Sequence, residues 1–445
     1  MEFRIQNRFK GGIKKRIFVS AGEFSGDAIL GIVLDALRKS HREIIPTWAN
    51  SEFQSLENIE FEFAGLGGAR AMRHGLNPLF PLTKMAVNGI LDVLLKSFFL
   101  WNAYHKILKS MRDFKPDLVL LVDYPGMNLR LAKKAQAAGF PVLFIAPPQV
   151  WVYRNAEKRL KKISRFLTGC DVHVLFPFEA ANFKSFASSV SVGHFWVTGG
   201  EGEVKNNQIG ERKTFLLCPG SRWPVLMRNL PNWLRYLKNR GYFAGNSRQI
   251  ETHFDARFEV LIPEAMKEKL LGWLEIYEKG FFSDKISLST DKEKSLAKAN
   301  WAIVFPGTMT LELALHIIPF MVFAIIDPLT FWMGKKVLKP KLKVGPGFGI
   351  EGKGEIDIAR GGEEDPILGL PNLLLEERVF PEWAGKVTKV TENFFQQKFE
   401  KLLVWNGDWE QILQGLGKKM GKGNGCEKVI ESIQKILLAT KSQNT

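Results

Sequence analysis

The stretch best suited to binding an anion is FLLCPGSR, residues 215–222. Four apolar residues predict a short buried strand, Pro219 and Gly220 turn the chain, and Ser221 and Arg222 begin a helical pattern. Such a turn directs backbone N–H groups and the positive end of a helix dipole at one spot. A guanidinium beside them suits a diphosphate. The alternative is a turn that only joins a strand to a helix.

A second stretch, FPGTMTLE at residues 305–312, has the same construction. A strand ends, Gly307 turns the chain, and Thr308 or Thr310 is expected to cap a helix whose first N–H groups could hold a phosphate. Glu312, one turn later, could accept hydrogen bonds from two ribose hydroxyls. The alternative, compatible with the first, is that threonine and glutamate form a capping box.

A carboxylate follows the most apolar segment of the first half. LVLLV, residues 118–122, is typical of a central parallel strand, and Asp123 comes directly after it. In open parallel sheets the carboxyl ends of the strands face the ligand. A carboxylate there can act as a general base, whereas its alternative role is to cap the following turn. We favour the general base, because an aspartate directly after so apolar a strand indicates a functional role.

The first strand of the chain, expected at Lys14 to Ser20, runs into the turn AGEFSGD. A glycine turn in this place is a usual ligand site of α/β domains, although its spacing is not the GxGxxG of dinucleotide binding. Glu23, Ser25 and Asp27 could therefore contact sugar hydroxyls. Alternatively, Ser25 or Asp27 only caps the helix expected from Ala28 to Ser40.

The segment from Met85 to Met111 is too apolar on all sides for a helix with a wet face, and too charged to span a bilayer. One interpretation is a buried helix. The other is a surface that dips into lipid headgroups, with Phe and Trp side chains inserted and basic residues around them.

The overall charge favours an anionic partner. The 445 residues carry a formal net charge of +16, which suits nucleic acid, an anionic membrane surface or a phosphorylated substrate. Nucleic acid has the least support, because no zinc-finger or RRM-like motif is present. The alternative is a merely soluble basic protein.

Several other classes are excluded by composition. Three scattered cysteines without a CxxC pair argue against a disulfide scaffold and fit a reducing cytoplasm. The absence of HxxxH, HExxH and Asp-x-Asp groups predicts no metal site. The apolar run after the basic N-terminus is too short for a signal peptide, and no run of about 18 uncharged apolar residues predicts a membrane span.

Strands and helices alternate on both sides of a glycine-rich polar stretch, residues 199–211, which is typical of a linker. The pattern predicts two α/β domains with parallel sheets. Residues 343–369 are expected to form a mobile glycine-rich loop, and His194, at a strand end, is expected to be structural rather than a ligand contact. Strands are expected at residues 14–20, 61–66, 118–122, 141–146, 171–176, 190–194, 215–218, 258–262, 286–290, 301–305 and 320–325.

The order of these motifs resembles the lipid-A-disaccharide synthase family from about Arg16 to Glu382. The matching segments are GEFSGD, MAVNGILDVL, KPDLVLLVDYPGMN, PPQVWVYR, LFPFE, VGH, LLCPGSR, PGTMTLE, DPLTFW with its following KK, and LPNLLLEERVFPE. The resemblance implies a GT-B fold, in which two Rossmann-like domains face each other across a cleft and a final helix crosses back. The implied domains are residues 1–205, 206–415 and a helical segment at 416–445.

The resemblance also implies a reaction. The sugar of UDP-2,3-diacylglucosamine moves with inversion to the 6-hydroxyl of 2,3-diacylglucosamine 1-phosphate, giving a β-1,6-linked tetraacyl disaccharide 1-phosphate and UDP. The implied location is the cytoplasmic face of the inner membrane, as a peripheral protein on an anionic surface. No cofactor, metal or nucleic acid is expected, and a homo-oligomer is compatible with the sequence.

Residue roles carry over by position. The catalytic residues are Asp123 as the base and Arg222 on the leaving diphosphate. The UDP contacts are Gly220, Ser221, Arg222, Gly307, Thr308, Thr310, Glu312 and Asn372. The sugar and acceptor contacts are Glu23, Ser25, Asp27, Asn88, Trp151 and Arg154. The contacts to membrane or acyl chains are Met85, Val93, Leu94, Phe98, Phe99 and Trp101.

Departures from the family pattern indicate a diverged member. Valine replaces the glutamate of GSRxxE, glycine replaces the second aspartate of DxPDFN, and proline begins the SGT match, at positions Val225, Gly126 and Pro306. Phe195 and Thr198 replace the proline and aspartate after VGH, and residues 343–369 are mostly an insertion. The alternatives are therefore a non-catalytic lipid- or nucleotide-binding relative, or another GT-B enzyme such as an epimerase acting on a soluble UDP-sugar.

Overall fold

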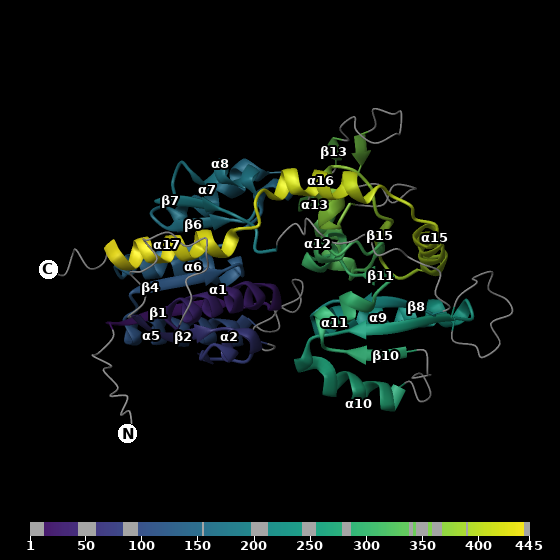
Figure 1. Cartoon of the computed structure of the whole chain (residues 1–445), viewed down its shortest axis with the longest axis horizontal. Helices are drawn as coiled ribbons and strands as arrows, with labels where there is room; N and C mark the ends of the chain where they lie inside the picture. The colour runs from purple at the N-terminus through teal and green to yellow at the C-terminus, as the bar shows by residue number, and fades with distance from the viewer. Residues whose placement is uncertain are drawn as a thin grey trace, which may run out of the picture.

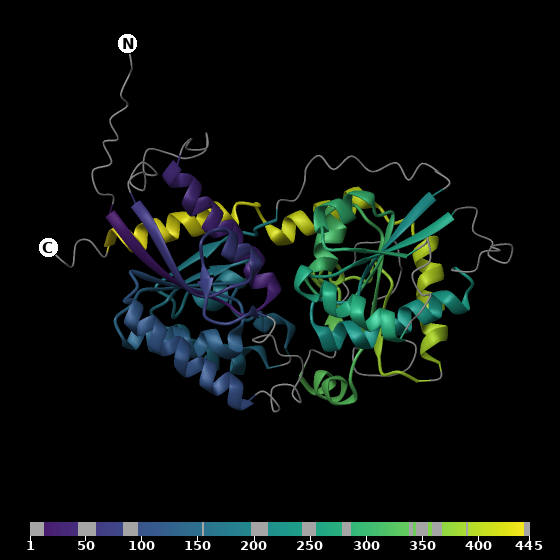
Figure 2. The same ribbon diagram turned by 90° about the horizontal axis from the view of Figure 1, so that it is seen from below.

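A computed structural model of the chain shows two α/β domains side by side, joined on one side by two helices near the C-terminus (Figures 1 and 2). The structure describes residues 13–42, 59–82, 97–153, 155–196, 212–242, 255–277, 286–337, 341–343, 355–357, 367–388 and 390–439. The linker expected at 199–211 lies outside them. So does most of the loop expected at 343–369, of which the structure describes residues 343, 355–357 and 367–369. Strands β13 (Lys341–Lys343) and β14 (Glu355–Asp357) form an antiparallel pair there.

The first domain is built on a parallel sheet of seven strands. Their spatial order is β3 (Asn77–Pro78), β2 (Ile59–Leu66), β1 (Ile13–Ala21), β4 (Leu118–Val122), β5 (Val142–Ile145), β6 (Asp171–Val174) and β7 (Ser189–Val192). The helices described between its strands are α1 (Phe24–Arg42), α2 (Ala69–Arg73), α5 (Ser97–Phe114), α6 (Pro125–Ala137), α7 (Ala156–Leu167) and α8 (Ala180–Phe183).

The central strand β4 is apolar on both of its faces, so both faces of this sheet must be covered. All five of its residues are buried, and alternate side chains point to opposite faces. Leu118, Leu120 and Val122 pack with α1, α2 and the last helix, whereas Val119 and Leu121 pack with α5, α6 and α7. A strand with this pattern has no wet face, so its first polar residue, Asp123, lies at the carboxyl edge of the sheet.

The second domain repeats the plan with a six-stranded parallel sheet. Its spatial order is β10 (Ile286–Ser289), β9 (Asp255–Leu261), β8 (Arg212–Cys218), β11 (Trp301–Val304), β12 (Phe320–Ile325) and β15 (Glu382–Gly385). Helices α9 (Trp223–Asn239), α10 (Lys267–Tyr277) and α15 (Thr391–Leu403) cover one face. The other face packs against α11 (Lys292–Lys298), α12 (Thr308–Leu315), α14 (Leu370–Leu375) and α16 (Trp409–Met420).

The expected strands are present with ends that differ by a few residues, which confirms the α/β fold with two parallel sheets. Four strands were not expected: β3 and β15 in the parallel sheets, and the antiparallel pair β13 and β14. The GEFSGD turn is also shorter than expected, because α1 already begins at Phe24. The polar residues of that motif therefore lie in the first turn of a helix.

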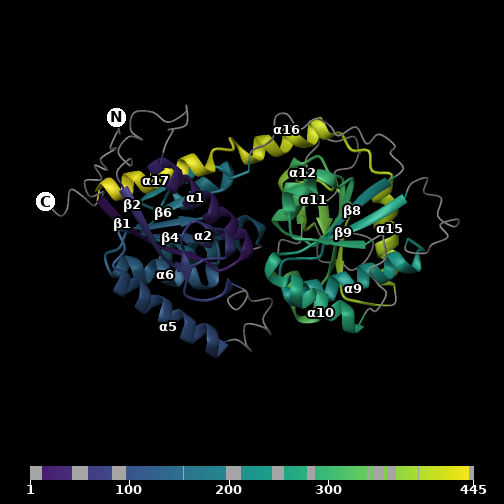
Figure 3. The ribbon, with the colours of Figure 1, turned by 60° about the horizontal axis from the view of Figure 1, so that its bottom comes forward.

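The C-terminal segment crosses from one domain to the other. Helix α16 packs on the core of the second domain, and α17 (Gly425–Ala439) packs on the core of the first (Figure 3). The crossing falls after Met420, where Gly425 N donates to His194 O at 3.0 Å. A Cβ on Gly425 would lie 2.6 Å from Gly193 O, so the VGH segment provides a close-fitting seat for the start of α17.

This packing predicts that the last helix stabilises the first domain. Ile433 is fully buried in the core that α17 shares with β1 and β4. We expect Ile433→Ala to lower the free energy of unfolding by about 2–5 kcal/mol, because it leaves a cavity. Urea unfolding followed by circular dichroism measures the effect. Leu438→Ala, on the same helix but 43% exposed, is the matched control, and equal small effects of both changes would contradict this role of α17.

Candidate active site

Each sheet reverses its strand order at one point. In the first sheet the reversal lies between β1 and β4, and in the second between β8 and β11. Ligands of doubly wound sheets bind at the carboxyl ends of strands at such points. Glu23 and Asp123 follow β1 and β4, while Arg222 and Gly307 follow β8 and β11. The topology therefore places the residues that the motifs singled out at the two reversal points.

The chain turns sharply after β4. Asp123 and Tyr124 have left-handed φ angles of 48° and 52°, which side chains other than glycine rarely adopt. Asp123 N donates to Ile145 O at 2.9 Å, and Tyr124 is the N-cap of α6. Gly22 lies so close that a Cβ there would be 2.2 Å from the Tyr124 ring. The turn is thus held from several sides and presents Asp123 at the sheet edge.

The environment of Asp123 disfavours its charged form. Burial raises the pKa of the Asp123 carboxyl to about 6, with a further contribution from the negative charge of Glu23. The backbone N–H of Tyr124 and the positive charge of Arg222 oppose this rise. A carboxylate with this pKa is still largely ionised at neutral pH and is a stronger proton acceptor than an ordinary aspartate.

Glu23 and Arg222 bring the two reversal points together. The Arg222 guanidinium forms an ion pair with the Glu23 carboxylate, and both side chains are partly buried. Phe24, the next residue of the first domain, packs against the core cluster of the second, as does Trp223. The expected diphosphate-binding arginine and the expected base therefore belong to one site between the domains.

The turn after β8 needs its glycine. Gly220 has a φ of +111°, and a Cβ there would lie 2.7 Å from Val225 Cγ1. Val225 is buried under this turn, so the valine that replaces the family's glutamate fills the space with apolar atoms. Ser221 is exposed, and Arg222 is the N-cap residue of α9. The start of α9 thus lies on the side of the ion pair, although Pro224 has no N–H group and Val225 N donates to Arg222 O at 3.1 Å.

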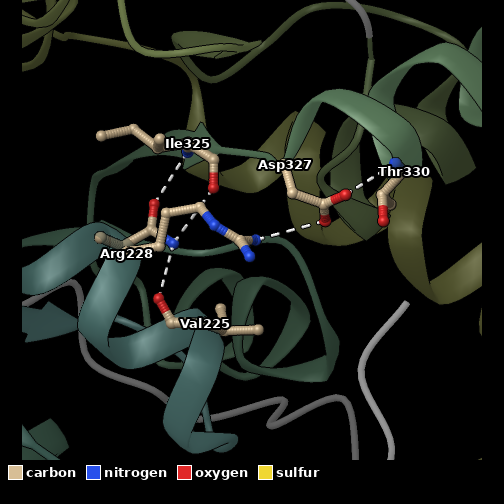
Figure 4. Close-up of polar contacts among 6 residues, drawn as sticks. Val225, Arg228, Ile325, Asp327 and Thr330 are labelled. Atoms are coloured by element: carbon tan, nitrogen blue, oxygen red, sulfur yellow. Dashed lines mark hydrogen bonds and ion pairs between the residues drawn. The ribbon is translucent and has the colours of Figure 1, made fainter. Parts of the chain in front are cut away.

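Helix α9 is anchored to the neighbouring strand β12 through polar contacts (Figure 4). The buried Asn229 accepts a hydrogen bond from Ile325 N at 2.8 Å and donates one to Val225 O at 2.9 Å. Arg228 lies 3.5 Å from Asp327, which accepts a bond from Thr330 N and so caps α13 (Pro328–Val337). These contacts fix the helix that carries Arg222 at its start.

The turn after β11 differs in detail from the expected one. Gly307 is the N-cap residue of α12 and has no side-chain cap, so the expected threonine cap is wrong, and so is the alternative of a capping box. Thr308 is half-buried at the start of the helix. Glu312 is buried and forms an ion pair with Lys292 of α11. Lys292 was not expected from the sequence, because no local pattern links it to a residue twenty positions later.

Two expected ligand residues have internal roles instead. The carboxylate of Asp27 is buried and accepts hydrogen bonds from the backbone N–H groups of Gly68, Arg70 and Ala71, so it caps α2 rather than its own helix. Thr310 is fully buried, donates to Gly307 O at 2.7 Å and accepts from Leu370 N at 3.1 Å. These contacts use the polar atoms that a ligand would need, so both predictions are corrected.

Asn372 is also part of the scaffold. Its amide is fully buried and bonds to Val379 N, Phe380 N, Phe380 O and the carboxylate of Glu382. Burial raises the pKa of Glu382 to about 7, and its oxygens also accept from Leu368 N and Gly369 N. The LPNLLLEERVFPE motif thus ties α14 to β15, which corrects the expected UDP contact.

Trp151 and His194 are held within the structure as well. The Trp151 indole donates to the buried Glu179 at 3.0 Å, and its ring is only partly buried, so its expected contact with the acceptor stays a prediction. Burial lowers the pKa of His194 to about 4, and its Nδ1 accepts from Trp196 N at 3.2 Å. The histidine therefore has the structural role that was expected.

The apolar block is described only from Ser97 onward. Met85, Asn88, Val93, Leu94 and Arg154 lie outside the described residues. Phe98 and Trp101 are 75% and 60% exposed, whereas Phe99 packs toward the core beside Phe80. One side of α5 is therefore buried and the other presents aromatic side chains, so neither interpretation describes the helix completely.

The described part of the chain contains neither a membrane-spanning helix nor a cluster of metal ligands. No helix there is long and apolar enough to cross a bilayer. No cluster of three or more His, Cys, Asp or Glu residues there could hold a metal ion.

The arrangement of two facing parallel sheets is that of GT-B proteins. The UDP-GlcNAc 2-epimerase of Methanocaldococcus jannaschii, solved with UDP-GlcNAc and UDP, has a TM-score of 0.50 and 12% sequence identity, with 95% of this chain and 100% of that chain covered. At this identity the likeness shows the fold alone, and it confirms the expected GT-B class.

The sequence comparisons show the family. The model of the lipid-A-disaccharide synthetase family matches residues 17–347. The lipid-A-disaccharide synthase of Coxiella burnetii is 31% identical over 336 residues, 73% of this chain and 79% of that protein. The synthase of Acidobacterium capsulatum is 27% identical over 420 residues, 91% of each chain. The chain belongs to the lipid-A-disaccharide synthetase family, and it is a hexosyltransferase of lipid A biosynthesis.

Restoring the family's residue at two of the departures should change the free energy of unfolding in opposite directions. Gly126 is exposed at the second position of α6, with no atom within 4 Å of a Cβ, so we expect Gly126→Asp to raise the free energy of unfolding by about 0.5–1 kcal/mol. Val225 is 4% exposed, so Val225→Glu should lower it by roughly 2–4 kcal/mol. Thermal unfolding measures both, and a neutral Val225→Glu would show that the turn has room for the family's glutamate.

Proposed function

We propose that the chain transfers 2,3-diacylglucosamine from UDP-2,3-diacylglucosamine to the 6-hydroxyl of 2,3-diacylglucosamine 1-phosphate, with Asp123 as the general base. The products are the β-1,6-linked disaccharide 1-phosphate and UDP. The observation that carries this proposal is the site between the domains. A carboxyl with a raised pKa lies at one reversal point, and the arginine from the other forms an ion pair with a carboxylate beside it.

In this mechanism Asp123 removes the proton of the attacking hydroxyl. Inversion requires the nucleophile and the leaving group to lie on opposite faces of the transferred sugar. Asp123 and Arg222 come from opposite domains, which suits that requirement. A pKa of about 6 leaves the base ionised at pH 7 and strengthens it relative to an ordinary carboxylate.

The leaving diphosphate would be stabilised from the second domain. Arg222 supplies a full positive charge, the turns at Gly220, Ser221, Gly307 and Thr308 would supply backbone N–H groups, and α9 and α12 supply their helix dipoles. The buried carboxylate of Glu312 would accept the ribose hydroxyls, with Lys292 holding one of its oxygens. A diphosphate at Arg222 would compete with Glu23, and that exchange frees Glu23, beside Ser25, for the acceptor sugar.

We also propose that α5 rests on the anionic surface of the inner membrane at its cytoplasmic face. Phe98 and Trp101 are exposed on this helix, which is the expected form of an interfacial anchor. The net charge of +16 adds a general attraction to anionic lipid. Acyl chains of both substrates would then stay in the lipid layer while their sugars enter the site. Self-association of the chain stays a prediction.

The base assignment predicts that Asp123→Asn lowers kcat by about 10²–10⁴-fold while the Kd for UDP is unchanged. In the wild type, kcat/KM should fall as the pH drops through about 6, because the protonated carboxyl cannot accept a proton. Disaccharide formation from the two lipid substrates, followed by mass spectrometry, measures both.

Arg222→Ala is the complementary variant, since it should weaken UDP binding at least tenfold in calorimetry. A near-normal rate for Asp123→Asn would exclude it as the base. The wild-type protein producing no disaccharide at all would instead favour the non-catalytic relative that the change at Val225 suggests.

The membrane proposal predicts that Phe98→Asp with Trp101→Asp lowers binding to vesicles of phosphatidylethanolamine and phosphatidylglycerol at least about tenfold. Co-sedimentation measures the bound fraction, and raised salt should also lower it. Val404→Asp is the matched control, because Val404 is 77% exposed but lies in the second domain beyond α15. Unchanged sedimentation of the double variant would remove α5 from the membrane contact.

A further inference from the structure

We propose that Asn128 is a positioning residue, which fixes the backbone of Asp123 and thereby aims its carboxylate. Asn128 lies in the first turn of α6 and is fully buried. This inference rests on the proposed function, because the position of the Asp123 carboxylate matters to the reaction only if Asp123 is the base.

The side-chain amide of Asn128 joins the two strands at the reversal point of the first sheet. Its Nδ2 donates to Ser20 O at 3.0 Å, to Val122 O at 3.2 Å and to Asp123 O at 2.8 Å. Its Oδ1 accepts from Ser20 Oγ at 2.6 Å. Three carbonyl oxygens face one side of the amide and a hydroxyl faces the other, so the network determines which atom is nitrogen.

These bonds link β1 to β4 at the end of their parallel ladder of hydrogen bonds. The pairing of β1 with β4 ends at Ala21 and Val122. Ser20 and Val122 lie at this end of the ladder and Asp123 lies just beyond it, and the amide of Asn128 donates to the carbonyl oxygen of each. An aspartate of the same shape would set a carboxylate against three carbonyl oxygens, and an aliphatic residue would donate nothing. The position therefore needs an amide for a physical reason.

The bond to Asp123 O bears directly on the base. Asp123 and the following Tyr124 both have left-handed φ angles, a conformation that persists only when surrounding contacts enforce it. Asn128 holds the carbonyl of the first and, through its backbone N–H to Tyr124 O at 3.0 Å, that of the second. Without the amide the turn can relax, and a displacement of the carboxylate by about 1 Å is enough to slow a positioned reaction by about 10²-fold.

The test is the steady-state rate of Asn128→Ala. We expect kcat to fall by about 10²-fold, with KM for both substrates and the Kd for UDP within about threefold of wild type. The kcat of Asn128→Ser, which keeps one hydrogen-bond donor, should lie between those of Asn128→Ala and the wild type. This variant takes the place of Asn128→Ala if the alanine variant does not fold. Placed in the Asp123→Asn background, Asn128→Ala should cause no further loss, because it acts through the carboxylate.

Two controls separate positioning from general loss of structure. Ser20→Ala removes the hydroxyl bond to Oδ1 but leaves the three bonds from Nδ2, and its kcat should stay within about threefold of wild type. Thr391→Ala removes an equally buried polar side chain, which accepts from Thr388 N and donates to Lys386 O in the second domain, and should lower Tm without the same fall in kcat.

The outcomes are distinct from those that test the base itself. A normal rate for Asp123→Asn overturns the base and, with it, this inference. If Asp123→Asn has the expected low residual rate, but Asn128→Ala raises KM instead, or lowers kcat equally in both backgrounds, the base stands and the positioning role is overturned.

Discussion

The ion pair between Glu23 and Arg222 is the contact on which the arrangement of the site depends. Its partners are 199 residues apart in the sequence and come from the reversal points of two different sheets. With side chains about one-third and one-quarter exposed, the pair contributes on the order of 1 kcal/mol, enough to bias the domains toward each other without locking them. The same two charges act in opposite directions on Asp123, so the spacing of the domains and the strength of the base are coupled.

Strongly apolar elements could be predicted from the sequence to the residue. LVLLV and FMVFAI, the strands β4 and β12, are apolar throughout because both faces of their sheets are covered. Strand β15 was not predicted, because it begins with a charged residue type. Its first residue is Glu382, a buried carboxyl whose partners lie 10 to 14 positions away, and a local pattern counts such a residue as exposed.

The order of motifs indicated the candidate site but could not separate residues free to contact a ligand from residues that support the fold. Asp27, Thr310 and Asn372 all have side chains capable of binding a sugar or nucleotide, and each is occupied by partners brought in by the fold. Glu23 and Arg222 differ from these residues, because they pair with each other at the boundary between the domains. Hydrogen-bond partners of this kind are set by tertiary structure, so residue type and spacing cannot reveal them.

The seat of α17 on the first domain has a consequence for how the molecule is made. Residues 425–439 complete a hydrophobic core whose other members begin at Ile17, so the first domain lacks part of its interior until the end of the chain has left the ribosome. The second domain, by contrast, contains its sheet and most of its covering helices within a continuous stretch. The domain synthesised first is therefore the one that finishes folding last, and a chain cut short before α17 would expose apolar surface to chaperones and proteases.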